Sequence, residues 1–262
     1  GRFAPLGRKT PGQPSGCAHS LGRVMASAVV QLREVSVRLG PVEALQRVNL
    51  GIQPGERVAL VGSNGSGKST LLRTVHGLLA PVQGTVDRHP NLRQAMLFQR
   101  PHLLRMSALN NVALGLWLDR SQGLNWAQSQ ARASGALQRV GLSAVAQQGG
   151  RQLSDGQQQR LAMARAWVRQ PDVLLLDEPT NHLDAESVQW LEGHLKSYPG
   201  AVLAVTHDRY FLDNVAEWIA EVDRGQIHGY EGNYSTYLET KKDRLKIEGQ
   251  KDAKRAKMLE RE

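Results

Sequence analysis

The sequence predicts an α/β fold with a mainly parallel sheet, because short apolar runs alternate with helical segments. Val173–Leu176 and Ala201–Val205 have the length of buried parallel strands, and the helical pattern of Ala185–Tyr198 lies between them. A glycine-rich loop at 62–70 follows a third apolar run, Arg57–Val61, and leads into another helix. Strands that alternate with helices favour a sheet covered by helices on both faces.

Further elements are expected around this core. Residues 107–168 have a helical pattern, with an apolar stretch at Ala108–Leu116 and a helix at Trp126–Val140. This block is too long for a single crossover between strands, so it predicts a separate helical subdomain at about 100–168. The remaining strands are expected at Val29–Arg38, Leu50–Ile52, Gly84–Val86 and Gln94–Phe98.

The loop at 62–70, GSNGSGKST, has the pattern of a polyphosphate-binding loop. Its glycines let successive backbone N–H groups face phosphate oxygens, and Lys68 adds a positive charge for the β- and γ-phosphates. The hydroxyl of Ser69 can ligate Mg²⁺, and the helix expected from Ser69 to Leu79 directs its positive N-terminus at the anion. The alternative is an ordinary glycine-rich turn. The expected nucleotide-binding residues are Gly62, Ser63, Asn64, Gly65, Ser66, Gly67, Lys68, Ser69 and Thr70.

Polar residues follow three of the expected strands at positions suited to phosphate chemistry. Asp177 and Glu178 stand at the end of Val173–Leu176, where ligands bind in open α/β sheets. A carboxylate there can hold Mg²⁺, and a second one can orient or deprotonate the water that attacks the γ-phosphate. Gln99 offers an amide to metal or water, and His207 could contact the γ-phosphate. Each of these two residues, considered alone, also fits a purely structural role.

Residues 153–157, LSDGQ, open a helix that is expected to run through Arg169. Ser154 and Gln157 fit a capping box, so one interpretation is an ordinary helix N-cap. The other interpretation is a second helix N-terminus directed at a phosphate.

The net charge of +9 belongs to the two ends of the chain. Residues 1–24 contain four basic and no acidic residues, and residues 241–262 contain nine basic and five acidic residues. The body between them is therefore nearly neutral. The mixed Lys/Glu pattern of 241–262 fits a solvated helix, and the alternative is contact with nucleic-acid phosphates.

Several classes of protein are disfavoured by the composition. No apolar run approaches the roughly 18 residues that span a bilayer. The single cysteine, Cys17, excludes an intrachain disulfide and fits a reducing compartment. Residues 1–24 lack the apolar stretch of a secretion signal. We expect residues 1–27 to be a disordered or non-native extension, with Met25 as the original start.

Taken together, these motifs resemble the ATP-binding cassette (ABC) family over about residues 28–230, in both order and spacing. The matching segments are GSNGSGKS at 62–69 (Walker A), Gln99 (Q-loop), LSDGQQQR at 153–160 (signature), VLLLDEP at 173–179 (Walker B), NHLD at 181–184 (D-loop) and His207 (switch histidine).

The resemblance implies a P-loop NTPase fold, in which an ABC nucleotide-binding domain has a mainly parallel core sheet, an antiparallel β subdomain and a helical subdomain. It implies ATP and Mg²⁺ as ligands and ATP hydrolysis as the activity. The implied catalytic residues are Glu178 as the base, His207, Gln99 and Lys68, and the implied metal ligands are Ser69, Gln99 and Asp177.

The resemblance also implies a partner. In this family two cassettes close head to tail, and each ATP lies between Walker A of one cassette and the signature of the other. This chain has one of each motif, so a second cassette is required, as a homodimer or a heterodimer. Ser154, Gly156 and Gln157 are expected to serve the partner's ATP.

Two positions depart from the family pattern. Asp155 stands where glycine is more common in the signature and places a carboxylate near the γ-phosphate. The family usually stacks adenine on an aromatic residue before the first helix, and the nearest equivalent here is Leu39. Adenine would then be held by apolar contact, with little selectivity for the base.

The two parts of the chain resemble different subfamilies. Residues 28–172 resemble ATPase subunits of bacterial importers, in which the segment after Gln99 receives a membrane permease. Residues 177–262 resemble ABC-F translation factors, and 231–262 resembles the start of their basic helical linker. The helical arm that ABC-F proteins carry after the Q-loop has no counterpart in 99–152.

From these resemblances we expect the ATPase subunit of a membrane importer. It would be cytoplasmic or peripheral at the inner face of the plasma membrane, without direct insertion into it. The alternative is an ABC-F factor that binds the ribosome and its RNA. A further hypothesis is that the chain is a hybrid or a truncated or misjoined reading frame, with a seam near Leu153–Glu178.

Overall fold

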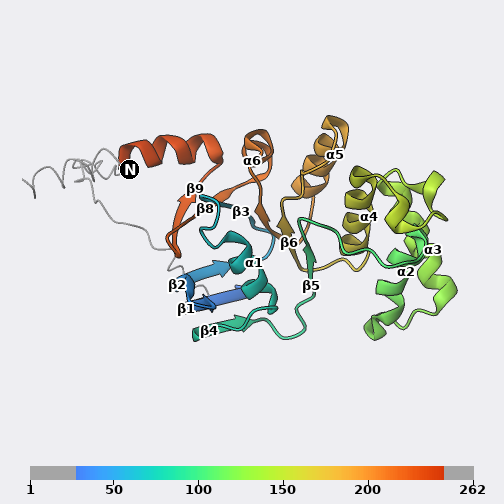
Figure 1. Ribbon diagram of the computed structural model, residues 1–262, viewed down its shortest axis with the longest axis horizontal. Helices are drawn as coiled ribbons and strands as arrows, with labels where there is room; N and C mark the ends of the chain where they lie inside the picture. Colours follow the sequence, from blue (N-terminus) through green and yellow to red (C-terminus); the bar gives the residue numbers. More distant parts are fainter. Residues whose placement is uncertain (1–27, 245–262) are drawn as a thin grey trace, which may run out of the picture.

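The large sheet of this protein is mainly parallel, as the sequence predicts. The computed structural model describes residues 28–244, and its six-stranded sheet has the order β5-β6-β7-β3-β8-β9 (Figure 1). Neighbouring strands from β5 to β8 pair in parallel, and β9 pairs antiparallel with β8. The strands are β3 (Arg57–Val61), β5 (Gln94–Leu97), β6 (Val173–Asp177), β7 (Ala201–Val205), β8 (Trp218–Asp223) and β9 (Gln226–Glu231).

The small sheet is antiparallel and has the order β2-β1-β4, which confirms the β subdomain that the family resemblance implies. Its strands are β1 (Val30–Leu39), β2 (Val42–Ile52) and β4 (Gln83–Arg88). The strand expected at Leu50–Ile52 is only the end of β2. The earlier part of β2 is rich in polar residues and contains Arg47 with a φ of 47°, so no apolar run marks it in the sequence.

Helix α1 (Lys68–His76) packs between the two sheets. Its buried Leu71, Leu72 and Val75 belong to the same apolar core as residues of both sheets. The helix ends before the expected Leu79, because Gly77 adopts a left-handed φ of 97° and donates its N–H to carbonyls of the last turn. α1 is therefore held between the two sheets through Leu71, Leu72 and Val75.

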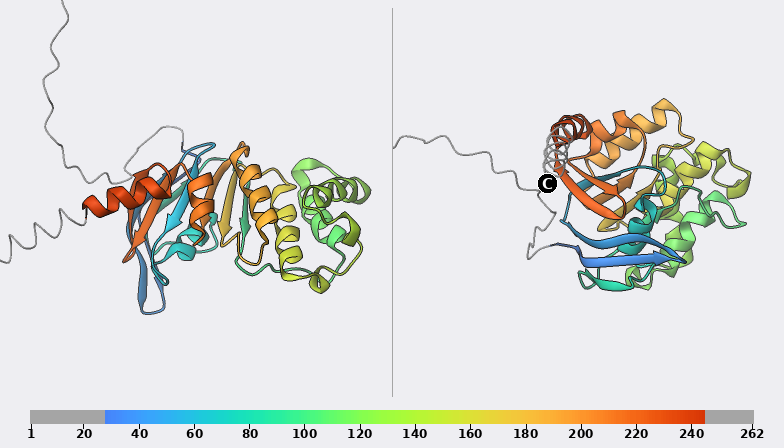
Figure 2. Two further views of the ribbon diagram at one scale, coloured as in Figure 1. Left: turned by 90° about the horizontal axis from the view of Figure 1, so that it is seen from above. Right: turned by 60° about the vertical axis from the view of Figure 1, so that its left-hand side comes forward.

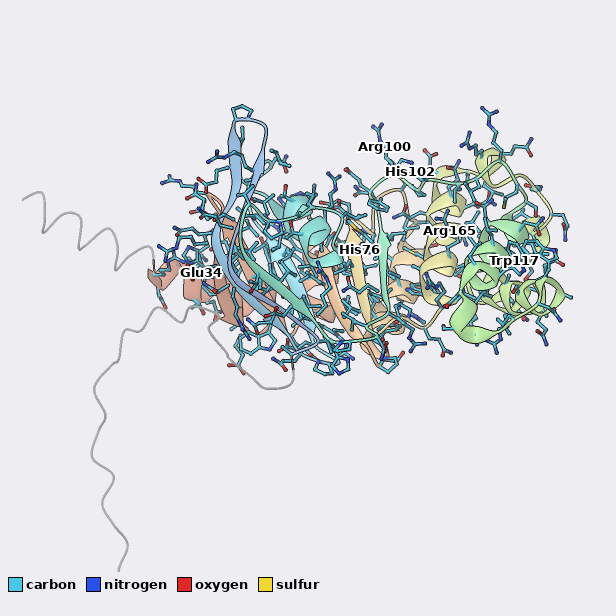
Figure 3. All side chains as sticks on the ribbon, turned by 90° about the horizontal axis from the view of Figure 1, so that it is seen from below. Glu34, His76, Arg100, His102, Trp117 and Arg165 are labelled. Carbon is cyan, nitrogen blue, oxygen red and sulfur yellow. The ribbon has the colours of Figure 1, made fainter. Side chains whose placement is uncertain are left out.

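The remaining helices lie on the opposite face of the large sheet and at one end of it (Figure 1). α4 (Asp155–Trp167), α5 (Ala185–Lys196) and α6 (Arg209–Val215) pack on that face. α2 (Ala108–Leu118) and α3 (Trp126–Arg139) join α4 in a separate apolar cluster at the end of the molecule where Figure 3 labels Trp117. Short 3₁₀ helices occur at Arg120–Gln122, Ser143–Val145 and Gly150–Gln152.

A helix over 234–244 closes the described part of the chain (Figure 2). It packs through Tyr234, Tyr237 and Leu238 against β3, β8, β9 and α6. The sequence prediction placed a helical tail at 231–262, and the part beyond 244 lies outside the described residues. The same holds for the predicted extension at 1–27. Within 28–244, none of the helices combines the length and apolar sequence that a membrane span requires.

Candidate nucleotide site

The phosphate loop joins the end of β3 to the start of α1, and its neighbours leave no room for side chains at two glycines. A Cβ on Gly62 would stand 2.3 Å from the carbonyl oxygen of Val222, and one on Gly67 would stand 2.6 Å from that of Ala44. Gly62, Gly65 and Gly67 all have positive φ, at 148°, 78° and 107°. The curled path of the loop therefore depends on glycine.

Lys68 folds back over its own loop. Its Nζ donates hydrogen bonds to the carbonyl oxygens of Gly62, at 2.9 Å, and Ser63, at 2.8 Å. Burial lowers the pKa of Lys68, while the nearby carboxylates of Glu178 and Asp177 oppose that shift. The ammonium group is thus enclosed at the position where the sequence predicts a charge for the terminal phosphates.

The order of the strands gathers four of the predicted residues at one edge of the sheet. β6, β7 and β3 are adjacent and parallel, so the segments that follow them leave the sheet together. The Ser69 hydroxyl donates to Asp177 Oδ1 at 3.1 Å, and His207 Nε2 lies 3.2 Å from Glu178 Oε1. Two of the three expected metal ligands, Ser69 and Asp177, therefore form one pair, and two expected catalytic residues, Glu178 and His207, form another beside it.

Both carboxylates of this site are buried, with residue exposures of 5% for Asp177 and 8% for Glu178. Burial raises the pKa of Asp177 above its usual value, against the hydrogen bond from Ser69. Burial also raises the pKa of Glu178, and the charge of His207 only partly offsets it. A carboxylate with a raised pKa is a better proton acceptor, which suits Glu178 to general-base chemistry.

The turn after β6 holds Glu178 in a strained conformation. Glu178 has a φ of 52°, a left-handed value that costs a non-glycine residue about 1–3 kcal/mol. Its N–H donates to the Val205 carbonyl at 2.8 Å, and the hydroxyls of Thr180 and Thr206 lie 3.0 Å apart beside it. The strain is therefore maintained by bonds between the ends of β6 and β7.

Gln99 lies at the same edge but apart from these pairs. It comes just after β5, the neighbour of β6, and is exposed. Among the described residues its side chain has no hydrogen-bond partner. The segment that follows is tied to α4, because Arg165 Nη1 donates to the carbonyl oxygen of His102 at 2.6 Å (Figure 3). Gln99 thus stands between the sheet and the helical subdomain.

The predicted signature residues form a capping box at the start of α4. Ser154 Oγ accepts from the Gln157 N–H at 3.4 Å, and the Ser154 N–H donates to Gln157 Oε1 at 3.1 Å. Gly156 lies against the D-loop, where a Cβ would stand 2.9 Å from the carbonyl oxygen of His182. The structure does not bring these three residues to the phosphate loop, and the cavity beside Lys68 has none of them in its lining.

The two departures from the family pattern have local explanations. Asp155 is the first residue of α4, where a carboxylate is favourable to the positive end of the helix. Leu39 ends β1 and is 43% exposed, so an apolar surface is available at that position.

The cavity beside Lys68 reveals a cluster that sequence reasoning missed. It has a volume of about 830 Å³, and Glu221 of β8 and Lys241 of the C-terminal helix are among its lining residues. Glu221 Oε1 and Oε2 accept from the hydroxyls of Tyr237, at 3.0 Å, and Tyr230, at 3.1 Å, and Lys241 Nζ also donates to Oε1. The i, i+4 spacing of Tyr237 and Lys241 was the available sequence signal.

This cluster attaches the C-terminal helix next to the phosphate loop. Glu221 pairs across the sheet with Val61, the last residue before the loop. Burial disfavours the charged form of Glu221, but Lys241 and the two tyrosine hydroxyls outweigh it and lower the pKa of that carboxyl. Burial, together with the charge of Glu221, raises the pKa of Tyr237 to about 12. Glu221 is therefore ionised, and it attaches the C-terminal helix to β8 through its bonds with Tyr237 and Lys241.

The fold and the loop geometry define a phosphate-loop nucleotide-binding protein. A family model described as ABC transporter matches residues 45–181, and a second model with the same description matches residues 220–262. The chain belongs to the ATP-binding cassette family of ATPases.

The curated relatives include the energy-dependent translational throttle protein EttA. The EttA of Mycobacterium tuberculosis strain H37Rv is 41% identical over 273 residues, and that of Escherichia coli K12 is 38% identical over 276 residues. These alignments cover 91% of this chain and 48% and 49% of the relatives. YfmR of Bacillus subtilis, named as an ABC transporter ATP-binding protein, is 35% identical over 256 residues, which cover 85% of this chain and 40% of YfmR. The chain spans about half the length of the curated relatives it matches.

The alignment to EttA tests the prediction that the two parts of the chain resemble different subfamilies. It covers nine-tenths of the chain, so likeness to ABC-F proteins is not confined to the residues after 177. It is 273 positions long although it includes only 91% of 262 residues, so EttA carries residues that have no counterpart here. The findings support the translation-factor alternative better than the importer prediction.

The solved structures that resemble this chain include the cassette MJ0796. It is 30% identical, with a TM-score of 0.69, and the match covers 77% of this chain and 98% of MJ0796. One of its structures is described as a dimeric post-hydrolysis state bound to ADP and Pi, and another as a dimer of a bacterial ABC transporter cassette.

Asp177→Asn should stabilise the nucleotide-free protein at pH 7, by about 0.5–2 kcal/mol. The raised pKa means that wild type loses stability as pH rises from the ordinary range of an aspartate through the native pKa of Asp177. The asparagine lacks this loss and still accepts the hydrogen bond from Ser69. Urea unfolding between pH 4 and pH 8 measures the difference, which should shrink toward the acidic end. Asp223→Asn, at an exposed position, is the control; equal effects of the two substitutions would contradict the burial argument.

Lys241→Met should destabilise the protein at pH 7, because it leaves the buried Glu221 carboxylate without its cation. We expect about 2 kcal/mol, less than for a fully buried pair because the Lys241 side chain is 35% exposed. Since the pKa of Glu221 is lowered, the loss should fade as pH drops and that carboxyl takes up a proton.

Urea unfolding of Lys241→Met beside Lys242→Met, the exposed neighbour, provides the measurement and its control. Restoration of stability in Glu221→Gln/Lys241→Met would support the pairing. An equal loss in Lys242→Met would count against it.

Proposed function

We propose that this chain binds and hydrolyses ATP at the phosphate loop, as one of two paired cassettes. The observation that carries the proposal is the meeting of two polar pairs, Ser69 with Asp177 and Glu178 with His207, at the strand edge beside Lys68. These pairs supply the ligands and the proton acceptor that phosphoanhydride hydrolysis needs.

The residues present fit ATP with Mg²⁺. Gly62 and Gly67 are packed too tightly against neighbouring carbonyl oxygens to carry side chains, which keeps the loop in its curled path, and the buried Ser66 hydroxyl has no partner among residues 28–244. Ser69 and Asp177 offer oxygen ligands, which Mg²⁺ prefers. One or two protein ligands are usual for Mg²⁺ when phosphates and water complete its coordination. A Mg²⁺ ion held there would neutralise charge on the phosphates.

Four residues of the chain have different roles in hydrolysis. Lys68, whose ammonium bonds the carbonyl oxygens of the loop, supplies positive charge for the terminal phosphates. Glu178 accepts a proton from the attacking water, and His207 orients the Glu178 carboxylate from 3.2 Å. Gln99, exposed next to this edge, offers a side-chain amide that would contact the metal or the water.

The second half of each site comes from another cassette. Ser154, Gly156 and Gln157 are held at the start of α4, away from the phosphate loop of their own chain. A helix N-terminus offers donors to an anion, so α4 is suited to the γ-phosphate bound by a partner. The dimeric description of MJ0796 supports this arrangement.

For the biological role, the likeness to EttA favours an ATP-dependent factor that acts on translation at the ribosome. The nine basic residues in 241–262 support contact with RNA phosphates. The second candidate is the ATPase subunit of a membrane importer, which the sequence of residues 98–116 favours.

Glu178→Gln should reduce ATP turnover by about 100-fold or more while ATP binding is retained, because the amide cannot accept the proton of the attacking water. Paired cassettes should then accumulate with ATP bound. A phosphate-release assay and size-exclusion chromatography in ATP and Mg²⁺ measure the two effects. Glu186→Gln, at an exposed position in α5, is the matched control and should turn over normally. Normal turnover in Glu178→Gln would remove Glu178 from the role of base.

The full chain carrying Glu178→Gln should co-sediment with ribosomes in the presence of ATP, and less so without it. Binding should fall steeply as salt rises, because RNA phosphates release counterions when basic residues bind them. Sucrose-cushion centrifugation at two salt concentrations makes the measurement. Absence from the ribosome pellet together with co-purification with a membrane permease would favour the importer instead.

A further inference from the structure

A second cavity lies far from the phosphate loop, between α3 on one side and the ends of α4 and α5 on the other. It has a volume of about 620 Å³. Arg93 and Gln170, which line it, precede β5 and β6, so it opens at the amino edge of the large sheet, whereas the phosphate loop lies at the carboxyl edge. We call it the arginine groove. Another cavity, of about 1020 Å³, shares Arg139, Trp167 and His194 with it, so the groove continues along that edge.

The arginine groove is positively charged. Its lining contains Arg93, Arg132, Arg139 and Arg169 and no carboxylate. Arg93 and Arg169 are paired with acids just outside the lining, and Arg132 donates to an amide. The Arg139 side chain has no hydrogen bond or ion pair with any residue of the described range 28–244. Guanidinium groups in this arrangement suit a phosphate, which they bind in a forked geometry.

One wall of the groove is aromatic. The rings of Trp167 and His194 are stacked with centroids 4.2 Å apart, and Trp190 lies 5.1 Å from Trp167 and 5.7 Å from His194. Trp167 Nε1 and His194 Nε2 are buried and lack partners among the described residues. Burial and the charge of Arg139 lower the pKa of His194, so its ring is neutral at pH 7 and behaves as an aromatic surface.

The arginines and the aromatic wall together restrict the class of ligand that the groove can bind. An apolar helix would gain nothing from Arg132 and Arg139, which have no acidic partner within residues 28–244, and an acidic peptide would gain little from three stacked rings. A nucleotide uses both, because its base stacks on aromatic side chains and its phosphate pairs with arginine. The groove volume of about 620 Å³ also lies in the usual range of pockets that bind small ligands such as nucleotides.

We propose that the arginine groove binds a nucleotide unit, with the base on the wall formed by Trp167, Trp190 and His194 and the phosphate on Arg139 and Arg132. The unit is either a free nucleotide or one nucleotide of a single RNA strand. This site is separate from the phosphate loop and does not depend on the function proposed above.

The test uses the full chain with Lys68→Ala, which disables the phosphate loop. The probes are adenosine monophosphate, followed by quenching of tryptophan fluorescence, and a fluorescein-labelled six-nucleotide RNA of mixed sequence, followed by fluorescence anisotropy. Arg139→Gln removes the unpaired guanidinium of the groove. Arg105→Gln removes an exposed arginine that does not line the groove, and is the matched control. Thermal unfolding checks that both variants remain folded.

We expect at least one probe to bind Lys68→Ala as tightly as wild type, and Arg139→Gln to weaken that binding about tenfold or more. Arg105→Gln should change it less than twofold. Equal affinity for both probes would identify a free nucleotide, and RNA binding that is tighter and falls with salt would identify a strand. Failure of both probes to bind, loss of binding in Lys68→Ala, or equal effects of the two glutamine variants would each overturn the proposal.

Discussion

The site depends on the parallel order β6-β7-β3, since three buried strands deliver their following segments to one edge of the sheet. Ser69, Asp177, Glu178 and His207 come from three distant parts of the chain and meet only because these strands are neighbours. The arrangement has a cost in stability. Two carboxylates lie where water is largely excluded, and one of them sits on a left-handed turn. Sites that bind charge commonly carry such a cost.

The sequence predicted those parts of the fold and site whose signal is local. The strand Ala201–Val205 has the predicted bounds, because a buried parallel strand is one uninterrupted apolar run. The phosphate loop was equally visible, because the contacts of Gly62 and Gly67 leave no alternative to glycine. Residues that follow strand ends could be grouped in advance, since parallel strands share one carboxyl edge.

The parts that the sequence did not predict depend on tertiary packing. Glu221 and Lys241 are far apart in sequence and have no motif, and they meet because the C-terminal helix lies along β8. β8 and β9 were missed, since the turn and polar residues around Arg224 give no long apolar run. Ser154 remains consistent with both of its interpretations. Its hydroxyl oxygen accepts a hydrogen bond of 3.4 Å, so a helix cap is present, but the bond is long enough for the oxygen to exchange it for another donor.

The close approach of Gly156 to His182 joins two halves of different sites. His182 lies on the segment that follows Glu178, in the site built on this chain's own loop, whereas Gly156 lies at the start of α4, the surface that we propose faces a partner. The two backbones approach too closely for a side chain at Gly156, so a displacement of the turn after Glu178 would reach the start of α4. In a pair of cassettes, this close approach would couple the nucleotide at each molecule's own phosphate loop to the nucleotide that its α4 faces in the partner.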